Sequence, residues 1–185
     1  PEGAKALLAE NGYVDSDGDG ILDKDGKKVS LQLITYGRTG LPQSSQALQS
    51  ALTQLGMEVT FEQLDSVEER CNAGEYDICA YAQVTLPTAD PYSYLVNNYG
   101  TGGTNNFGKY SNAEVDELLA QMASEFDVDK RSELAVKIQQ IVTSDSSVCN
   151  MFHLNMFMAM KANVKGINQS PVDYYHINVD TCIEE

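Results

Sequence analysis

The sequence predicts an α/β fold in which a mixed, mostly parallel sheet is flanked by helices. Segments with the patterns of strands and helices alternate from residue 29 to residue 84, and helices connect the strands. Helical connections favour parallel pairing through right-handed crossovers. Two amphipathic helices follow, and hydrophobic residues make up 42% of the 185 residues, which is enough to form a core.

The first part of the chain predicts a helix, a strand and a second helix. Residues 1–13 form an amphipathic segment that Gly12 can end. Residues 29–36, VSLQLITY, place apolar side chains on both faces, as in a strand that is covered on both sides. Residues 41–56 carry an apolar stripe with helical spacing, and Gly56 suits the position just past the helix end.

The next part predicts two further strands around a short helix. Residues 57–64, MEVTFEQL, alternate apolar and polar side chains, which indicates a half-buried strand. Ser66 and Glu69 have the spacing of a capping box and predict the start of the helix. Residues 76–84, YDICAYAQV, predict the third strand of the sheet.

A glycine-rich loop and two amphipathic helices follow the predicted sheet. Residues 100–108, GTGGTNNFG, lack the lysine of a phosphate-binding loop and predict a flexible surface loop. Helices are predicted over residues 111–126 and 129–145. The first of them opens with Ser111 and Glu114 at capping-box spacing.

The end of the chain predicts two more strands. Residues 148–160, VCNMFHLNMFMAM, form a continuous apolar run and predict a buried strand. We expect His153 and the methionines of this run to pack in an interior or an interface rather than to bind a metal. Residues 164–179 predict a turn and a last short strand.

Charge limits the classes of partner. The formal net charge is −15, which disfavours binding to nucleic acids and to anionic membranes. No apolar run is long enough to cross a bilayer. The chain begins with PEGAKALLAENGY, without an initiator methionine or a signal peptide, so we expect a piece of a longer protein.

The four cysteines leave the redox state open. An even number permits two disulfides in an oxidising compartment, with three possible connectivities, and four buried free thiols would give the same sequence. No Cys-x-x-Cys pair or Cys/His cluster indicates a structural zinc site. The cysteines are Cys71, Cys79, Cys149 and Cys182.

Two loops are the candidates for a binding site, because ligands of open α/β sheets bind beyond the carboxyl ends of the strands. The loops are YGRTGLP, residues 36–42, and QVTLPTADPYSY, residues 83–94. Arg38 and Asp90 are their only ionisable side chains apart from tyrosine. No nucleophile lies beside a base in either loop, so we expect reversible binding rather than catalysis.

Each of these two charged residues has a functional and a structural interpretation. Arg38 is suited to clamp a carboxylate, and a solvated loop arginine fits the sequence equally well. Asp90 precedes Pro91 and is placed to hold a cationic group. An aspartate in this position more often caps the following helix, here PYSYLV.

The stretch DSDGDGILDKDG, residues 15–26, has the pattern of a calcium-binding loop. Gly20 stands at the turn position, but Gly26 replaces the glutamate that normally supplies the twelfth ligand. The alternative is a turn-rich hairpin with Asx turns. Calcium at this place, on the amino-terminal side of the first strand, would be a stabilising clip away from the binding loops. The candidate calcium ligands are Asp15, Asp17, Asp19 and Asp23.

The order of the motifs resembles one family along nearly the whole chain. The segment LGMEV, the pair Asp90-Pro91, and YSNAEVDELL followed by KRSELAVKIQQI are specific in combination. With them, the chain is similar to the second lobe of the extracellular solute-binding proteins, family 5, of peptide and nickel importers. The resemblance implies a periplasmic-binding-protein-like lobe of type II. Residues 1–185 would then form a single α/β lobe of a longer, two-lobed protein.

The resemblance also implies a function. Such a receptor closes on a peptide or a nickel complex by a hinge motion and delivers it to the membrane permease of an ABC importer. The protein would be a monomer and not an enzyme, without a required cofactor. It would be extracellular or periplasmic, and tethered to the membrane through the missing N-terminal part.

The resemblance further implies that this chain supplies one wall of the ligand cleft. Many peptide-binding relatives carry an acidic residue for the peptide amine where this chain has Leu86 or Pro87. Nickel-binding relatives carry an aromatic residue near Val84 and a histidine further on, and this chain has neither. The ligand therefore stays open between the two classes. The predicted wall residues are Arg38, Thr39, Gln83, Val84, Thr85, Thr88 and Tyr92.

Two other classes of protein are the alternatives. One is a calcium-stabilised structural or adhesion module built around the acidic loop. The other is a small α/β hydrolase, which would need a nucleophile or an acid–base pair at the two candidate loops.

Overall fold

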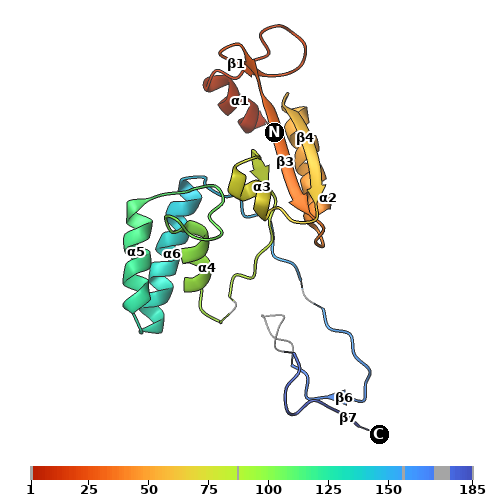
Figure 1. Ribbon diagram of the computed structural model, residues 1–185, viewed down its shortest axis with the longest axis vertical. Coiled ribbons are helices and arrows are strands. Elements are labelled where there is room, and N and C mark those ends of the chain that lie inside the picture. The colour runs from red at the N-terminus through yellow and green to blue at the C-terminus, as the bar shows by residue number, and fades with distance from the viewer. Residues whose placement is uncertain (1, 87, 156, 169–175, 185) are drawn as a thin grey trace. The chain divides into compact units, whose positions relative to one another are not determined.

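The computed structural model of the chain describes residues 2–86, 88–155, 157–168 and 176–184 (Figure 1). The packing of the backbone divides the chain into two compact units, which we call unit 1 (Pro1–Gln83) and unit 2 (Val84–Glu185). Each is described by itself below. Whether residues 1–185 form a single lobe stays a prediction. Among the described residues, no helix combines the length and the apolar composition that crossing a membrane requires.

Unit 1 contains the predicted parallel sheet. Its three strands have the order β4-β3-β5, and β3 pairs in parallel with both neighbours. Figure 1 shows β3 and β4 side by side, with α2 packed against them. The elements are α1 (Glu2–Glu10), β1 (Asp23–Lys24), β2 (Lys27–Lys28), β3 (Ser30–Tyr36), α2 (Leu41–Gln54), β4 (Glu58–Leu64), α3 (Glu68–Ala73) and β5 (Ile78–Cys79).

The central strand β3 carries the core of unit 1. Leu33, Ile34 and Thr35 are fully buried, because consecutive side chains point to opposite faces of a sheet that is covered on both sides. The edge strand β4 alternates exposed and half-buried residues over most of its length, as its sequence predicts. The predicted parallel arrangement is therefore confirmed.

The helix α2 begins and ends at glycines with positive φ. Gly40 precedes the first helical residue with a φ of 85°, and Gly56 follows the last turn with a φ of 91°. A Cβ at position 56 would lie 3.1 Å from Cγ of Leu22. Gly56 is thus required both by the backbone conformation and by close packing, and its predicted place past the helix end is confirmed.

Two predictions for unit 1 are wrong in detail. The third strand spans only Ile78–Cys79 instead of residues 76–84, because side-chain hydroxyls rather than strand amides bind the carbonyls that follow. The capping box does not form either. The helix α3 begins at Glu68 without a side-chain cap, and the Ser66 hydroxyl donates to the Glu68 carboxylate instead.

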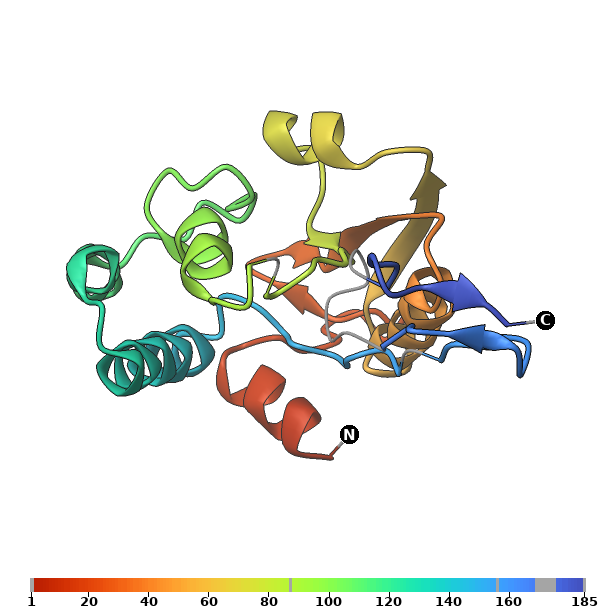
Figure 2. The ribbon, with the colours of Figure 1, turned by 90° about the horizontal axis from the view of Figure 1, so that it is seen from below.

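Unit 2 is built on three packed helices. Figures 1 and 2 show α4 (Tyr92–Tyr99), α5 (Ala113–Ser124) and α6 (Val128–Ser144) side by side. A short antiparallel pair, β6 (Val164–Lys165) and β7 (Cys182–Ile183), belongs to the same unit. The core between the helices consists of Leu95, Tyr99, Val115, Leu119, Met122, Ala135, Ile138 and Val142.

Both long helices start at a capping side chain. The side-chain oxygen of Asn112 accepts hydrogen bonds from the Glu114 and Val115 amides, so the cap of α5 lies one residue after the predicted Ser111. Asp127 caps α6 in the same way. Serine and asparagine are about equally good caps, so the sequence pattern alone could not separate neighbouring candidates.

The prediction of a buried strand at residues 148–160 is wrong for the described part of this segment. None of its described residues is in a strand, and Phe157 is 91% exposed. His153 is exposed as well. An apolar run becomes a buried strand only beside a neighbour that pairs with it, and no described residue pairs with this one. Residues 164–179 predict a turn and then a last short strand, but the structure has the two-residue strand β6 at the start of this range and no strand at residues 176–179. Residues 169–175 lie outside the described part.

Candidate functional site

The predicted loops begin at one edge of the sheet in unit 1. Because β3 and β5 are parallel neighbours, residues 37–40 and 80–83 both follow the carboxyl ends of their strands. Thr35 Oγ1 donates to the Ala80 carbonyl at 3.0 Å, and Tyr36 OH donates to the Ala82 carbonyl at 3.2 Å. These bonds hold the second segment beside the end of β3. Arg38, Thr39 and Gln83 therefore lie at the same edge.

Arg38 has an environment that favours an anion. Its side chain is exposed, and among the residues that the structure describes no carboxylate forms an ion pair with it. Its carbonyl accepts a hydrogen bond from the Leu41 amide, which fixes the turn before α2. Arg38 stands three residues before Leu41, the first residue of α2.

A tyrosine pair supports the second segment. The rings of Tyr36 and Tyr81 lie 5.5 Å apart between centroids, and Tyr81 OH donates to the Glu68 carboxylate at 3.1 Å. Burial and this hydrogen bond raise the pKa of Tyr81 to about 12, so the phenol stays protonated. The hydrogen bond from Ser66 is the main cause that lowers the pKa of Glu68. The hydrogen bond between the Tyr81 phenol and the Glu68 carboxylate thus positions the backbone of the second segment, residues 80–83.

The remaining predicted wall residues belong to unit 2. Val84 and Thr85 are half-buried, whereas Thr88 is exposed, and Pro87 lies outside the described residues. The Ala89 amide closes a turn by donating to the Leu86 carbonyl at 3.2 Å. Ala89 has a φ of 59°, an uncommon conformation for a residue other than glycine.

Asp90 is bound within unit 2. Arg131 on α6 donates Nη2 to its Oδ1 at 2.7 Å and Nε to its Oδ2 at 2.9 Å. The Tyr92 amide donates to Oδ1 at 2.8 Å, at the start of α4. Burial tends to raise the pKa of Asp90, but the bonds from Arg131 and Tyr92 outweigh it and hold the pKa below its usual value. The structural interpretation of Asp90 is therefore the one that these contacts support.

Arg131 is a residue that the sequence reasoning missed as a partner of Asp90. Its Nη1 also donates to the carbonyls of Met122 at 2.5 Å and Glu125 at 2.7 Å, which ties the end of α5 to α6. The two residues are 41 positions apart, so no local pattern connects them. Their only signal in the sequence is that each belongs to one of the motifs that carry the family resemblance.

Tyr92 lines an open groove within unit 2. The groove has a volume of about 430 Å³ and lies between α4, residues 100–104 and α5. Asp116 lines the groove, and its carboxylate accepts hydrogen bonds from the Thr101 amide at 2.9 Å and the Thr101 hydroxyl at 2.6 Å. Because these polar groups bind one another, the groove offers an aromatic face rather than a free charge.

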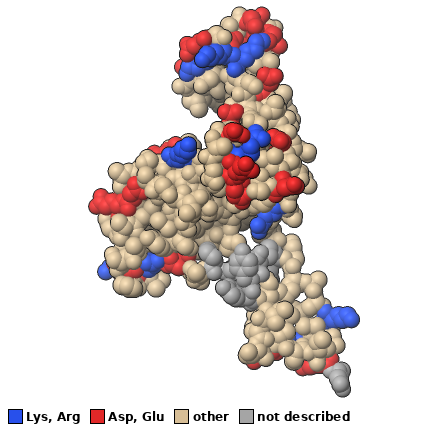
Figure 3. Space-filling view, viewed as in Figure 1, with Lys and Arg blue, Asp and Glu red and all other residues tan. Residues whose placement is uncertain are grey.

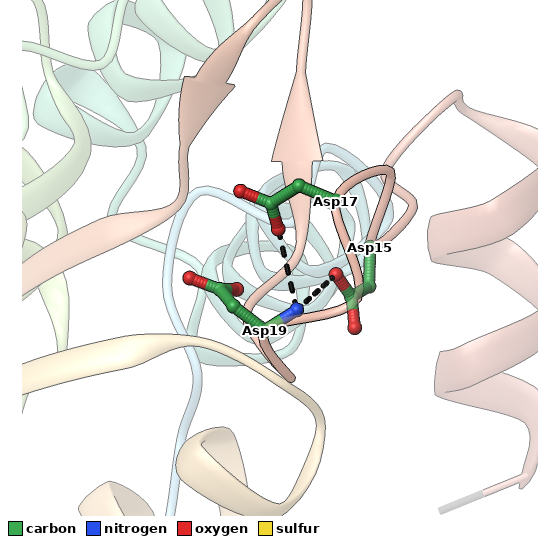
Figure 4. Close-up of side chains that lie close together, drawn as sticks. All are labelled: Asp15, Asp17 and Asp19. Carbon is green, nitrogen blue, oxygen red and sulfur yellow. Dashed lines mark hydrogen bonds between the residues drawn. The ribbon is translucent and has the colours of Figure 1, made fainter.

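The acidic loop brings three of its four candidate ligands together. Carboxylate oxygens of Asp15, Asp17 and Asp19 lie within 4.8 Å of one another. Figure 4 shows the Asp19 amide donating to Asp15 at 3.1 Å and to Asp17 at 3.3 Å. Asp23 is not part of this group, because both of its carboxylate oxygens accept hydrogen bonds from Ser16.

A lysine already neutralises part of this group. Lys28 Nζ lies 3.5 Å from Oδ2 of Asp17 and forms a second ion pair with Asp19. On the face drawn in Figure 3, acidic and basic side chains lie side by side at the β1 end of unit 1. The turn-rich hairpin with Asx turns, which the sequence left as the alternative, describes these contacts.

The fold is α/β, and the candidate site lies at the carboxyl edge of a parallel sheet and carries little charge. The model of the bacterial extracellular solute-binding proteins, family 5 (middle part), matches residues 1–106. The chain belongs to this family, and its fold is of the type II periplasmic-binding-protein class.

Curated relatives are binding proteins. The oligopeptide-binding protein AppA of Bacillus subtilis is 32% identical over 94% of this chain and 33% of its own length. The nickel-binding protein NikA of Staphylococcus aureus is 28% identical over 99% of this chain and 36% of its own length. The chain therefore spans about a third of the length of these relatives.

Solved structures agree in fold along the chain. The structure of AppA in complex with a nonapeptide matches with a TM-score of 0.83 and 28% identity, over 100% of this chain and 37% of AppA. Staphylococcus aureus NikA in complex with Ni(L-His)2 matches with a TM-score of 0.74 and 27% identity, over 99% and 38%. The comparisons give no support to an adhesion module or a hydrolase.

Proposed function

We propose that this chain is part of an ABC-importer receptor that captures a peptide or a nickel complex outside the cytoplasm. The observation that carries the proposal is the arrangement at the carboxyl edge of β3 and β5. There, residues 37–40 and 80–83 follow adjacent parallel strands, and the exposed Arg38 is their one charged side chain. The chain belongs to family 5. Such an edge suits reversible binding, because backbone groups and hydroxyls give directional contacts without a reactive pair.

Binding follows from closure of two lobes around the ligand. A ligand stabilises the closed state by as much as its contacts in that state exceed those in the open state. This chain supplies one wall, and the rest of the receptor supplies the other. The wall residues in this proposal are Arg38, Thr39, Gln83, Val84, Thr85, Thr88 and Tyr92.

Charge narrows the contacts that the ligand makes with this wall. Arg38 is available for a carboxylate, which both a peptide and an amino-acid chelate of nickel carry. Residues 84–88 contain no acidic side chain, so a peptide amine finds no counter-charge there. Asp90 is bound by Arg131 and does not fill this role. Recognition at this wall therefore depends on an anionic ligand group and on backbone contacts.

The other parts of the proposal concern the whole receptor. It acts as a monomer without catalysis, docks to a membrane permease and is tethered to the membrane outside this segment. The acidic loop, residues 15–26, is separate from the ligand-binding wall, and its role in this proposal is structural. Calcium there would hold Asp15, Asp17 and Asp19 as a clip, in competition with Lys28.

Native mass spectrometry of the full-length receptor, purified from its host, tests the proposal. A retained ligand appears as a mass excess, with the isotope pattern of nickel for a chelate and without it for a peptide. A receptor that shows no excess, and gains none after incubation with nickel and L-histidine or with a peptide pool, would overturn the proposal.

A further inference from the structure

Two cysteines of unit 1 meet between a helix and a strand. The thiol of Cys71 on α3 donates a weak hydrogen bond to Sγ of Cys79 on β5, at a sulfur–sulfur distance of 3.5 Å. Cys71 is 1% exposed and Cys79 is half-buried. The proposed binding function uses neither thiol, so the pair calls for an explanation of its own.

The fold fixes both ends of this pair. On one side, α3 closes at Gly74, whose φ is 72°, and the Glu75 amide donates to the Arg70 carbonyl at 3.0 Å. On the other side, Asp77 and Gln32 exchange hydrogen bonds at 2.7 and 3.0 Å and lead the chain into β5. The hydrogen bonds around α3 and β5 therefore hold the two sulfurs close together. A disulfide requires the sulfur–sulfur distance to shorten from 3.5 Å to about 2.05 Å.

We propose that Cys71 and Cys79 form a disulfide in the mature extracellular protein. The inference rests on the extracellular setting of the family and not on the proposed ligand. Secreted and periplasmic proteins meet an oxidising environment in which such bonds form and persist. The two other cysteines, Cys149 and Cys182, are exposed and lie in unit 2. Of the cysteine pairs that the sequence allows, Cys71 and Cys79 are the pair whose sulfurs the structure brings into contact.

The bond forms by thiol–disulfide exchange with a disulfide-bearing oxidant. The Cys71 thiolate attacks the oxidant, forms a mixed disulfide and releases one thiolate. The Cys79 thiolate then attacks the Cys71 sulfur and releases the second thiolate. The two cysteines lose two protons and two electrons, and the oxidant leaves as two thiols.

The thiols are protected once the unit has folded. Burial is the main cause that raises the pKa of both Cys71 and Cys79 above the usual thiol value. Because the thiolate is the reactive form, the folded dithiol exchanges slowly at neutral pH. We therefore expect the bond to form during export and folding.

The disulfide would hold the chain just before the candidate site. Residues 80–83 follow Cys79 directly, and the hydrogen bond from Tyr81 to Glu68 already joins the same two elements. A covalent link between α3 and β5 would hold the start of residues 80–83 at the end of β5 within unit 1.

Peptide mapping of the full-length receptor tests the pair directly. Cells are quenched with acid and free thiols are alkylated before lysis, so that oxidation in air does not count. Trypsin releases both cysteines in one peptide, residues 71–109, because no lysine or arginine lies between Arg70 and Lys109. Cys149 and Cys182 fall in two other peptides.

We expect the peptide 71–109 to be two hydrogens lighter than the dithiol and to accept two alkyl groups only after reduction. In Cys79→Ser the same peptide should carry one alkylated cysteine, whereas Cys182→Ser should leave it unchanged. Two alkyl groups on the wild-type peptide without reduction, or a link from Cys71 to a cysteine of unit 2, would overturn the inference.

Discussion

Arg131 binds Asp90 through two nitrogens and the carbonyls of Met122 and Glu125 through a third. One side chain on α6 thereby fixes the end of α5 and the turn before α4. Asp90 of the Asp-Pro motif thus contacts Arg131 of the second family motif, KRSELAVKIQQI. This contact explains the charge of Asp90 within the candidate loop, residues 83–94, without a role in binding the ligand.

Loss of Arg131 should destabilise unit 2. We expect Arg131→Ala to lower the free energy of unfolding by about 1–3 kcal/mol, because hydrogen bonds to a charged, partly buried group are lost together. Arg131→Lys should recover only part of this, since an ammonium lacks the planar fork. Urea unfolding of the receptor measures the effect, with exposed Lys130→Ala as the control. Equal midpoints for Arg131→Ala and Lys130→Ala would contradict the structural role.

The same ion pair makes the stability depend on pH. The pKa of Asp90 is lowered in the folded state, so the unfolded chain binds its proton at a higher pH. The contribution of Asp90 is therefore fully present above the ordinary pKa near 3.8 and is lost as the pH falls through the lowered folded value. Asp90→Asn should be less stable than wild type at pH 7, with a difference that shrinks towards pH 2. A difference that stays constant over this range would speak against the assignment.

The cap of α5 distinguishes two neighbouring residues. We expect Asn112→Ala to cost about 1 kcal/mol, because the Glu114 and Val115 amides lose their acceptor. Ser111→Ala should cost much less, since its hydroxyl contacts only the exposed Thr101 hydroxyl among the described residues. Thermal unfolding of both variants decides, and a larger loss for Ser111→Ala would restore the capping box that the sequence predicts.

Calcium at the acidic loop should compete with Lys28. Wild type should bind calcium weakly, because the cation must displace an ammonium group from Asp17 and Asp19. Lys28→Gln removes that competitor and should raise the affinity by about tenfold, as expected for one nearby unit charge. Calorimetry with calcium chloride measures this, with Asp17→Ala in the same background as the negative control. No heat of binding from Lys28→Gln would exclude calcium as a clip.

Local patterns predicted β3 and β4 of unit 1 because these two segments are regular over most of their length. Residues 29–36 are apolar on both faces and 57–64 alternate, so the central strand and the edge strand follow from the sequence. Gly56 marks the end of α2 for a steric reason that is equally local. The two candidate loops follow from the parallel order of these strands.

Contacts between distant residues could not be predicted in this way. The pairing of Arg131 with Asp90 and the approach of Cys71 to Cys79 depend on how helices and strands pack, which no window of sequence contains. The apolar run at residues 148–160 is predicted to be buried, but several of its described residues are exposed. Its pattern indicates burial without showing whether another part of the chain lies beside it. Burial requires a partner as well as an apolar side chain.

The binding of ligands by the full-length receptor tests the central claim most directly. Calorimetry with nickel and L-histidine, and separately with a nonapeptide pool, compares wild type with Arg38→Ala, Thr85→Ala and the exposed control Lys137→Ala. We predict that wild type binds one of the two probes and that Lys137→Ala binds the same probe with the same affinity. Arg38→Ala should weaken this binding about tenfold or more, because a charged hydrogen bond to the ligand is lost. Binding of neither probe by wild type, or unchanged affinity in both Arg38→Ala and Thr85→Ala, would contradict the account.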